Sequence, residues 1–84
     1  MQEPTARGAL EAWYAEAKHA QWKAPADIKA RYAHASIINA ERVVFNIGGN
    51  KYRLVVAISY VSGIVLIKLV GSHADYDKIN VETI

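Results

Sequence analysis

The sequence predicts an α+β fold in which two N-terminal helices pack on one face of a small antiparallel β-sheet, followed by a short C-terminal helical turn. Apolar residues in the first third of the chain recur at helical spacing. From about residue 42 onward the apolar period changes to two, and β-branched and aromatic residues dominate. Because 84 residues provide only one hydrophobic core, we expect a single domain over residues 1–84.

The first helix is predicted over residues 6–20. Leu10, Trp13, Tyr14 and Ala17 are three and four residues apart, which places them on one face of an amphipathic helix. We expect this face to pack against the sheet. Its aromatic residues are therefore interpreted as core residues and not as groups that stack on a ligand.

A second, shorter helix is predicted to begin at Pro25, a residue suited to the first helical position. Asp27 is favourably placed against the helix dipole, and Ile28 and Tyr32 are expected to point inward. We expect this helix to end near Ala33.

Three strands follow, predicted at residues 42–47, 52–61 and 64–70. The dipeptides Gly48-Gly49 and Ser62-Gly63 separate them. Glycine tolerates positive φ, so each dipeptide favours a tight hairpin with a two-residue loop. The strands should therefore form an antiparallel meander.

Two-residue loops place Asn46 opposite Lys51, Val44 opposite Arg53, and Ala57 opposite Lys68. Side-chain alternation then gives the sheet one apolar face, which the helices should cover, and one face that stays open. The predicted apolar face contains Val43, Phe45, Ile47, Tyr52, Leu54, Val56, Ile58, Tyr60, Val65, Ile67 and Leu69. The predicted open face contains Arg42, Asn46, Lys51, Arg53 and Lys68, with Val44, Val55, Ala57, Leu66 and Val70 between them.

Candidate catalytic residues gather where the third predicted strand ends. Because this strand runs antiparallel to the one before it, its end returns to the level of Arg53, and His73, Tyr76 and Lys78 follow at once. RNA cleavage through the ribose 2′-hydroxyl requires a base, a cation beside the phosphorane and an acid for the leaving 5′-oxygen. An imidazole, a guanidinium and a phenol supply these groups.

Each of these residues also has a purely structural interpretation. A histidine after a strand is often a turn residue, and cations such as Lys51 and Lys68 can simply solvate an open sheet face. The ring of Tyr76 can pack against the end of the sheet. Asp75 and Asp77 can do no more than start a short helix.

Composition narrows the classes of function. The net charge of +2 and the pI near 9.0 suit a polyanionic partner only if the cations cluster. With no cysteine, disulfides and thiolate zinc sites are impossible, and we expect a cytoplasmic protein. No carboxylates or histidines have the spacing of metal ligands, so we expect no metal and no other cofactor. The longest uncharged stretch, residues 54–67, is shorter than the ~20 residues of a membrane-spanning helix.

Two segments, Val43–Leu54 and Lys68–Ile79, resemble the HigB family of bacterial toxins. Gln21–Lys23 and Ala26–Lys29 are similar to that family as well, and the resemblance covers about residues 10–79. It implies a RelE-like fold and degradation of translated mRNA on the ribosome. It also implies neutralisation by a cognate helix-turn-helix antitoxin of the HigA type.

The sequence therefore favours the toxin of a type II toxin–antitoxin system, a metal-independent endoribonuclease that cleaves translated mRNA on the ribosome. The expected catalytic residues are Arg53, His73 and Tyr76. The expected RNA-binding residues are Arg42, Asn46, Lys51, Lys68 and Lys78. The alternative is a non-catalytic module that uses the same basic face to bind ribosomal RNA or the antitoxin.

The chain departs from the family pattern at several positions. Gly48 stands where lysine is common, Ser72 where threonine is usual, and Lys68 where arginine is frequent. The family usually opens with a short strand, and Met1–Thr5 does not resemble one. We therefore expect an exposed sheet edge, open to pairing with a partner or with another copy of the chain.

Overall fold

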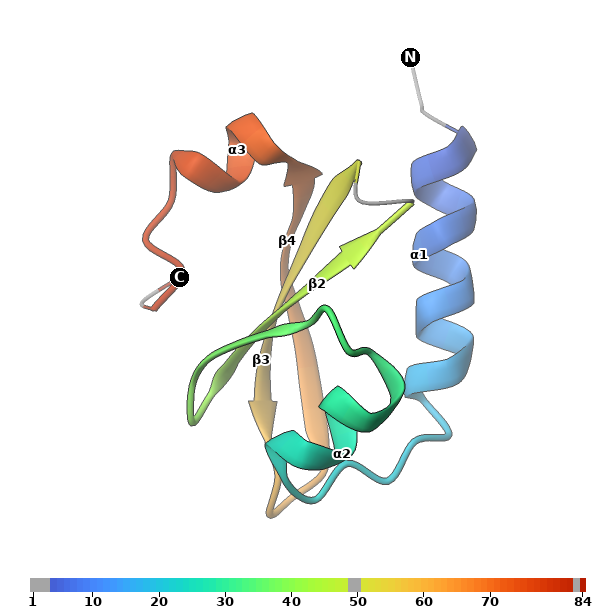
Figure 1. The fold of residues 1–84 in the computed structure, drawn as a ribbon, viewed down its shortest axis with the longest axis vertical. Coiled ribbons are helices and arrows are strands. Elements are labelled where there is room, and N and C mark those ends of the chain that lie inside the picture. The colour runs from blue at the N-terminus through green and yellow to red at the C-terminus, as the bar shows by residue number, and fades with distance from the viewer. Residues whose placement is uncertain (1–3, 49–50, 83) are drawn as a thin grey trace.

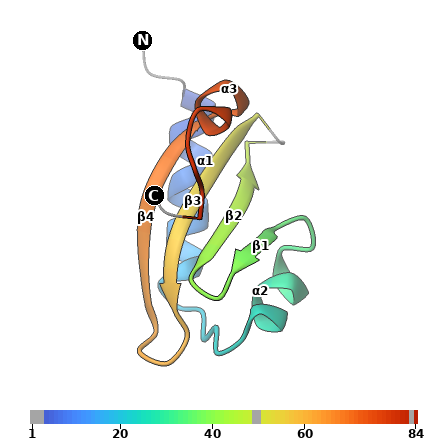
Figure 2. The same ribbon diagram turned by 90° about the vertical axis from the view of Figure 1, so that its left-hand side faces the viewer.

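The computed structural model describes residues 4–48, 51–82 and 84 and shows an α+β fold (Figure 1). Its elements are α1 (Pro4–Ala17), α2 (Pro25–Arg31), β1 (Ser36–Asn39), β2 (Arg42–Ile47), β3 (Tyr52–Ser59), β4 (Ile64–Ser72) and α3 (His73–Asp77). Helix α1 lies on one face of the sheet, and α3 with the segment after it lies on the opposite face (Figures 1 and 2). Within the described residues, no helix is both long and apolar enough to cross a membrane.

The sheet is a four-stranded antiparallel meander in the order β1-β2-β3-β4. The sequence predicted β2, β3 and β4 but not β1. This strand has only four residues and an irregular register, with Ile37 opposite Val43 and Asn39 opposite Arg42. A segment this short does not show a period of two, which explains why the pattern did not reveal it.

The core lies between α1, α2 and the sheet, and Phe45 is at its centre. The ring centroid of Phe45 is 5.3 Å from that of Trp13, 5.8 Å from Trp22 and 5.1 Å from Tyr32. Leu54, Val56 and Ile58 are buried on the same face, as predicted.

The expectation for Tyr14 was wrong. Its side chain is 57% exposed, whereas the neighbouring Trp13 is only 4% exposed. Consecutive helical residues are rotated by about 100° from one another. Because the buried side of α1 is narrow, Trp13 faces the core while Tyr14 lies at the margin of the buried side.

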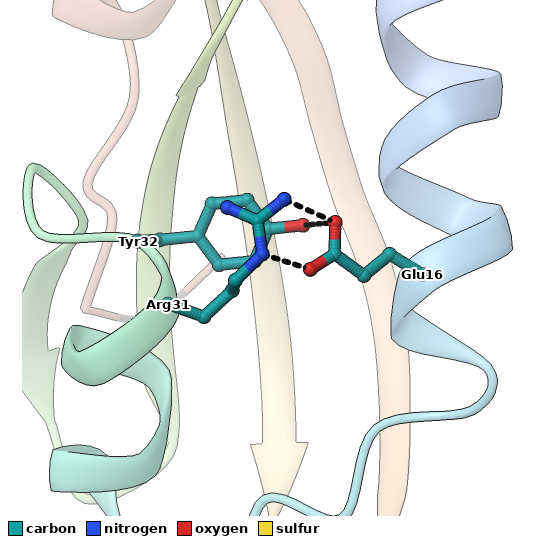
Figure 3. Close-up of polar contacts among 3 residues, drawn as sticks. All are labelled: Glu16, Arg31 and Tyr32. Carbon is teal, nitrogen blue, oxygen red and sulfur yellow. Dashed lines mark hydrogen bonds and ion pairs between the residues drawn. The ribbon is translucent and has the colours of Figure 1, made fainter.

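A polar cluster joins the two N-terminal helices (Figure 3). The Glu16 carboxylate of α1 accepts hydrogen bonds from the Arg31 guanidinium at 2.9 Å and from the Tyr32 hydroxyl at 2.9 Å. Burial, together with the hydrogen bond to Glu16, raises the pKa of Tyr32 to about 12. The three side chains connect the C-terminal end of α2 to α1.

The first hairpin has a longer connection than predicted. Ile47 pairs with Tyr52, so Asn46 lies opposite Arg53 and not opposite Lys51. Gly48 has a positive φ of 61°, as expected for a turn glycine, whereas Gly49 and Asn50 lie outside the described residues. The register differs from the prediction by two residues, a shift that keeps every side chain on its predicted face.

The second hairpin also differs from the prediction, and here one part of the predicted face is wrong. Ala57 pairs with Leu66 instead of Lys68, and the register shifts between Val55 and Val56. Beyond this bulge Leu69 pairs with Val55 and Val70 pairs with Leu54. One extra residue in β4 therefore exchanges the faces of Leu69 and Val70.

The prediction of an open second face was also wrong in part. Val44 and Val55 lie on that face but are 1% and 0% exposed. The segment after α3 runs across this face (Figure 2). There the Arg42 guanidinium donates hydrogen bonds of 3.1 and 2.7 Å to the main-chain oxygen of Ile84. The C-terminal segment thus covers part of the basic face.

Candidate functional site

Arg53 is at the centre of the candidate site. It lies in β3, with Asn46 of β2 opposite it on one side and Gly71 of β4 on the other. Its side chain is half-buried. The guanidinium carbon is 4.8 Å from the ring centroid of Tyr76 in α3, a cation–π contact. Two of the three predicted catalytic residues are therefore in contact.

Helix α3 brings Tyr76 to this place because the chain turns back sharply after β4. The side chain of Ser72 accepts a hydrogen bond of 3.2 Å from the Asp75 amide, and the Asp75 carboxylate accepts one of 3.1 Å from the Ser72 amide. This reciprocal pair is a capping box, which starts the helix at His73.

Gly71 is required for the same turn. A Cβ at this position would lie 2.8 Å from both the Cβ and the Oδ2 of Asp75. That distance is shorter than side chains tolerate, so the first turn of α3 approaches the end of β4 closely only because residue 71 is glycine. Gly71, which lies opposite Arg53 in β4, therefore also allows Tyr76 to contact Arg53.

The Nε of Arg53 is buried and has no hydrogen-bond partner among the described residues. Leaving a buried donor unsatisfied costs about 1–3 kcal/mol, and more when the group is charged. An unpaired donor of this kind can accommodate an anionic oxygen.

Two further predicted residues lie at the same end of the sheet. Tyr52, the first residue of β3, pairs with Ser72, the last residue of β4, so Lys51 directly precedes this pair in the chain and His73, the first residue of α3, directly follows it. Both side chains are exposed. His73 is three residues before Tyr76 in α3, a spacing that makes two residues neighbours on a helix surface.

Lys78 and Asn46 complete the residues near Arg53. Lys78 is the exposed C-cap residue of α3, directly after the helix that carries Tyr76. The side-chain amide of Asn46 donates a hydrogen bond of 3.3 Å to the main-chain oxygen of His34. Asn46 therefore connects β2 to the segment before β1.

The structure does not bring Arg42 and Lys68 to this site. Arg42 pairs with Ala57, four residues along β3 from Arg53, which corresponds to about 13 Å at the rise of a strand. Its guanidinium is bonded to Ile84. Lys68 is exposed at the bulge of β4.

Sequence reasoning missed the residues that position the site. The pattern Ser72-His73-Ala74-Asp75 has the spacing of a capping box, and it was interpreted only as the start of a short helix. Nothing in the sequence pointed to Gly71 as a close-approach glycine or to Ile84 as a partner of Arg42. In the described part of the chain, no three His, Asp or Glu side chains gather as metal ligands would.

Comparison with known proteins places the chain in a family. No curated protein matches it. A family model described as HigB_toxin, the RelE-like toxic component of a toxin–antitoxin system, matches residues 6–79. The match includes α1 from residue 6 onward, the whole of α2, all four strands, and α3 with His73 and Tyr76. The chain therefore belongs to the HigB toxin family, the RelE-like toxic components of toxin–antitoxin systems.

Proposed function

We propose that this toxin is a metal-independent endoribonuclease that cleaves translated mRNA on the ribosome. The observation that carries the proposal is the contact between Arg53 and Tyr76 at 4.8 Å, held by a helix that Gly71 and the Ser72 cap fold back onto the sheet. A partner antitoxin follows from family membership. We propose that it is a helix-turn-helix protein of the HigA type.

In the proposed reaction the ribose 2′-oxygen attacks the adjacent phosphorus while the bond from phosphorus to the 5′-oxygen breaks. A base removes the 2′-proton and an acid protonates the leaving oxygen, which leaves a 2′,3′-cyclic phosphate and a 5′-hydroxyl. His73 serves as the base or the acid. Tyr76 either stacks on a base or supplies a proton.

Arg53 has a different role, which is to stabilise the charge of the phosphorane. A guanidinium forms two parallel hydrogen bonds with phosphate oxygens, and its buried Nε gives Arg53 a donor that no described residue uses.

The basic residues around Arg53 are proposed to hold the RNA backbone. Lys51 and Lys78 are exposed at the same end of the sheet, and Asn46 lies opposite Arg53. Arg42 and Lys68 are proposed to extend this surface away from the reacting phosphate. Contact between RNA and Arg42 requires the segment that ends in Ile84 to move aside.

The test is induced expression in bacteria followed by primer extension on a translated message. The proposal expects new 5′ ends within coding sequence, and their loss in Arg53→Ala and His73→Ala. Ala40→Ser serves as the control, because Ala40 is exposed in the turn between β1 and β2, away from Arg53 and His73. Growth arrest without cleavage would favour the alternative, a module that only binds ribosomal RNA or the antitoxin.

A further inference from the structure

Strand β4 forms a free edge of the sheet and is apolar on both of its faces. It is the last strand in the order β1-β2-β3-β4, and among the described residues no strand pairs with its outer side (Figure 2). Leu66 is 56% exposed and Ile64 54% exposed on one face, and Ile67 is 46% exposed on the face toward α1. Exposed apolar residues along an unpaired edge mark a site for strand addition.

A groove accompanies this edge on the α1 side. Two adjoining cavities of about 260 and 240 Å³ lie between the end of α1 and the β3–β4 hairpin, and they share Ala17, Ala20, Gly63 and Val65. The exposed Tyr14 and Ile67 line the second cavity, beside the buried Trp13. The groove therefore gives apolar side chains a place next to the free backbone of β4.

The charges around the groove are of one sign. Lys23 lines the first cavity and Lys18 the second, and neither lining includes an Asp or Glu. Lys68 is exposed on β4 itself. An occupant that combines apolar and acidic side chains suits this surface.

A second copy of the chain suits it poorly. Strand β4 spans Ile64–Ser72, so Lys68 is its middle residue. Full antiparallel pairing of β4 with its own copy would place the two Lys68 side chains directly opposite each other. Like charges at opposite positions destabilise a strand pair, and the bulge at this point disturbs the pairing further.

We propose that the free edge of β4 and the adjoining groove bind an extended, acidic and apolar segment of the antitoxin, which adds to the sheet as a fifth strand. The inference rests on membership in a toxin–antitoxin family and not on ribonuclease activity. A strand in this position covers Lys68, one of the proposed RNA-binding residues. Antitoxin binding and RNA binding would then compete at the edge of the sheet.

The probe is the antitoxin that family membership implies, purified together with the intact toxin. Hydrogen exchange should slow at the amides of residues 64–72 in the complex. Calorimetry then compares Ile67→Glu with Ile67→Lys, because both variants remove the same apolar contact and introduce opposite charges. Ala40→Glu and Ala40→Lys repeat these charge changes in the exposed β1–β2 turn, at the opposite edge.

We expect Ile67→Glu to weaken binding by about tenfold or more, Ile67→Lys to weaken it less, and both Ala40 variants to bind like the parent. Since Ile67 is half-exposed, circular dichroism should show that its variants remain folded. Protection confined to other elements, or equal affinities for the two Ile67 variants, would overturn the proposal.

The toxin alone should sediment as a monomer. A dimer that Ile67→Glu dissociates would show instead that a second copy occupies the edge. A toxin that binds its partner at β4 but cuts no RNA would refute the proposed ribonuclease function and leave this inference standing.

Discussion

Substitution of Gly71 by alanine tests how closely activity depends on the turn that positions Tyr76. A methyl group at this position would lie 2.8 Å from the Cβ and Oδ2 of Asp75, so the first turn of α3 has to move away from β4. That movement opens the cap between Ser72 and Asp75, which is worth about 1 kcal/mol. Because α3 buries none of its residues, the strain should shift this helix without unfolding the sheet.

The expected loss of stability is therefore small, about 1–2 kcal/mol in urea unfolding. The loss of activity should be larger. A displacement of about 1 Å in a catalytic group can lower the rate by about 10²-fold, and Tyr76 moves with α3. RNA cleavage and equilibrium unfolding measured on the same preparation separate the two effects.

Gly8→Ala provides the matched control. A Cβ at residue 8 meets nothing within 4 Å, so this change in α1 should be neutral or slightly stabilising and should leave cleavage unchanged. Ser72→Ala removes the cap without the clash and should give an intermediate effect. If Gly71→Ala cleaves RNA at the parental rate, the position of Tyr76 over Arg53 does not matter for the reaction.

Three further results are expected. Arg53→Ala should lower the turnover of RNA cleavage by about 10²-fold or more. His73→Ala should lower it by about 10²–10⁴-fold and flatten one limb of the pH–rate profile. If His73→Ala is folded and still arrests growth like the parent, His73 is only a turn residue. Cleavage should persist in EDTA and leave 2′,3′-cyclic phosphate ends, whereas a 5′-phosphate product would exclude attack by the 2′-hydroxyl. Folding raises the pKa of Tyr32 from 10.0 to about 12, so the folded state favours the neutral phenol. The contribution of Tyr32 to the free energy of unfolding is therefore complete below pH 10 and is lost as the pH rises toward 12. The free energy of unfolding should therefore decline between pH 9 and pH 12, and it should decline less in Tyr32→Phe than in the parent. Equal declines in the two proteins would show that ionisation of Tyr32 is not the cause.

The sequence predicted those parts of the fold that have a clear period. Strand β2 begins and ends at the predicted residues, and Pro25 begins α2 as expected. Among the described residues, the glycines with positive φ are Gly48 and Gly63, which lie in the dipeptides that predicted the hairpins. In these segments local conformational preference and the tertiary structure agree, which is why the pattern alone was sufficient.

The errors arose where one residue or one distant contact decides the structure. The bulge in β4 adds one residue opposite β3, and alternation cannot reveal where an extra residue lies. Val44 and Val55 are buried on the face that the segment after α3 crosses, and the contact of this segment with Arg42 joins residues 42 and 84, which no local pattern encodes. For the site, the sequence predicted that Arg53, His73 and Tyr76 share one end of the sheet, but not the close approach at Gly71 that brings Tyr76 onto Arg53.

The order of the strands has a consequence for how the chain folds. Each strand of the sheet is hydrogen-bonded to the strand next to it in the sequence, so most of its pairings close short loops. Folding rates rise as the sequence separation of contacting residues falls. The meander can therefore form early, and the docking of α1 on β2 is the slower, long-range step. Because Trp13 becomes buried against Phe45 only in that step, the fluorescence of a Trp22→Phe variant, which keeps Trp13, should follow the completion of the core and lag behind the formation of the sheet.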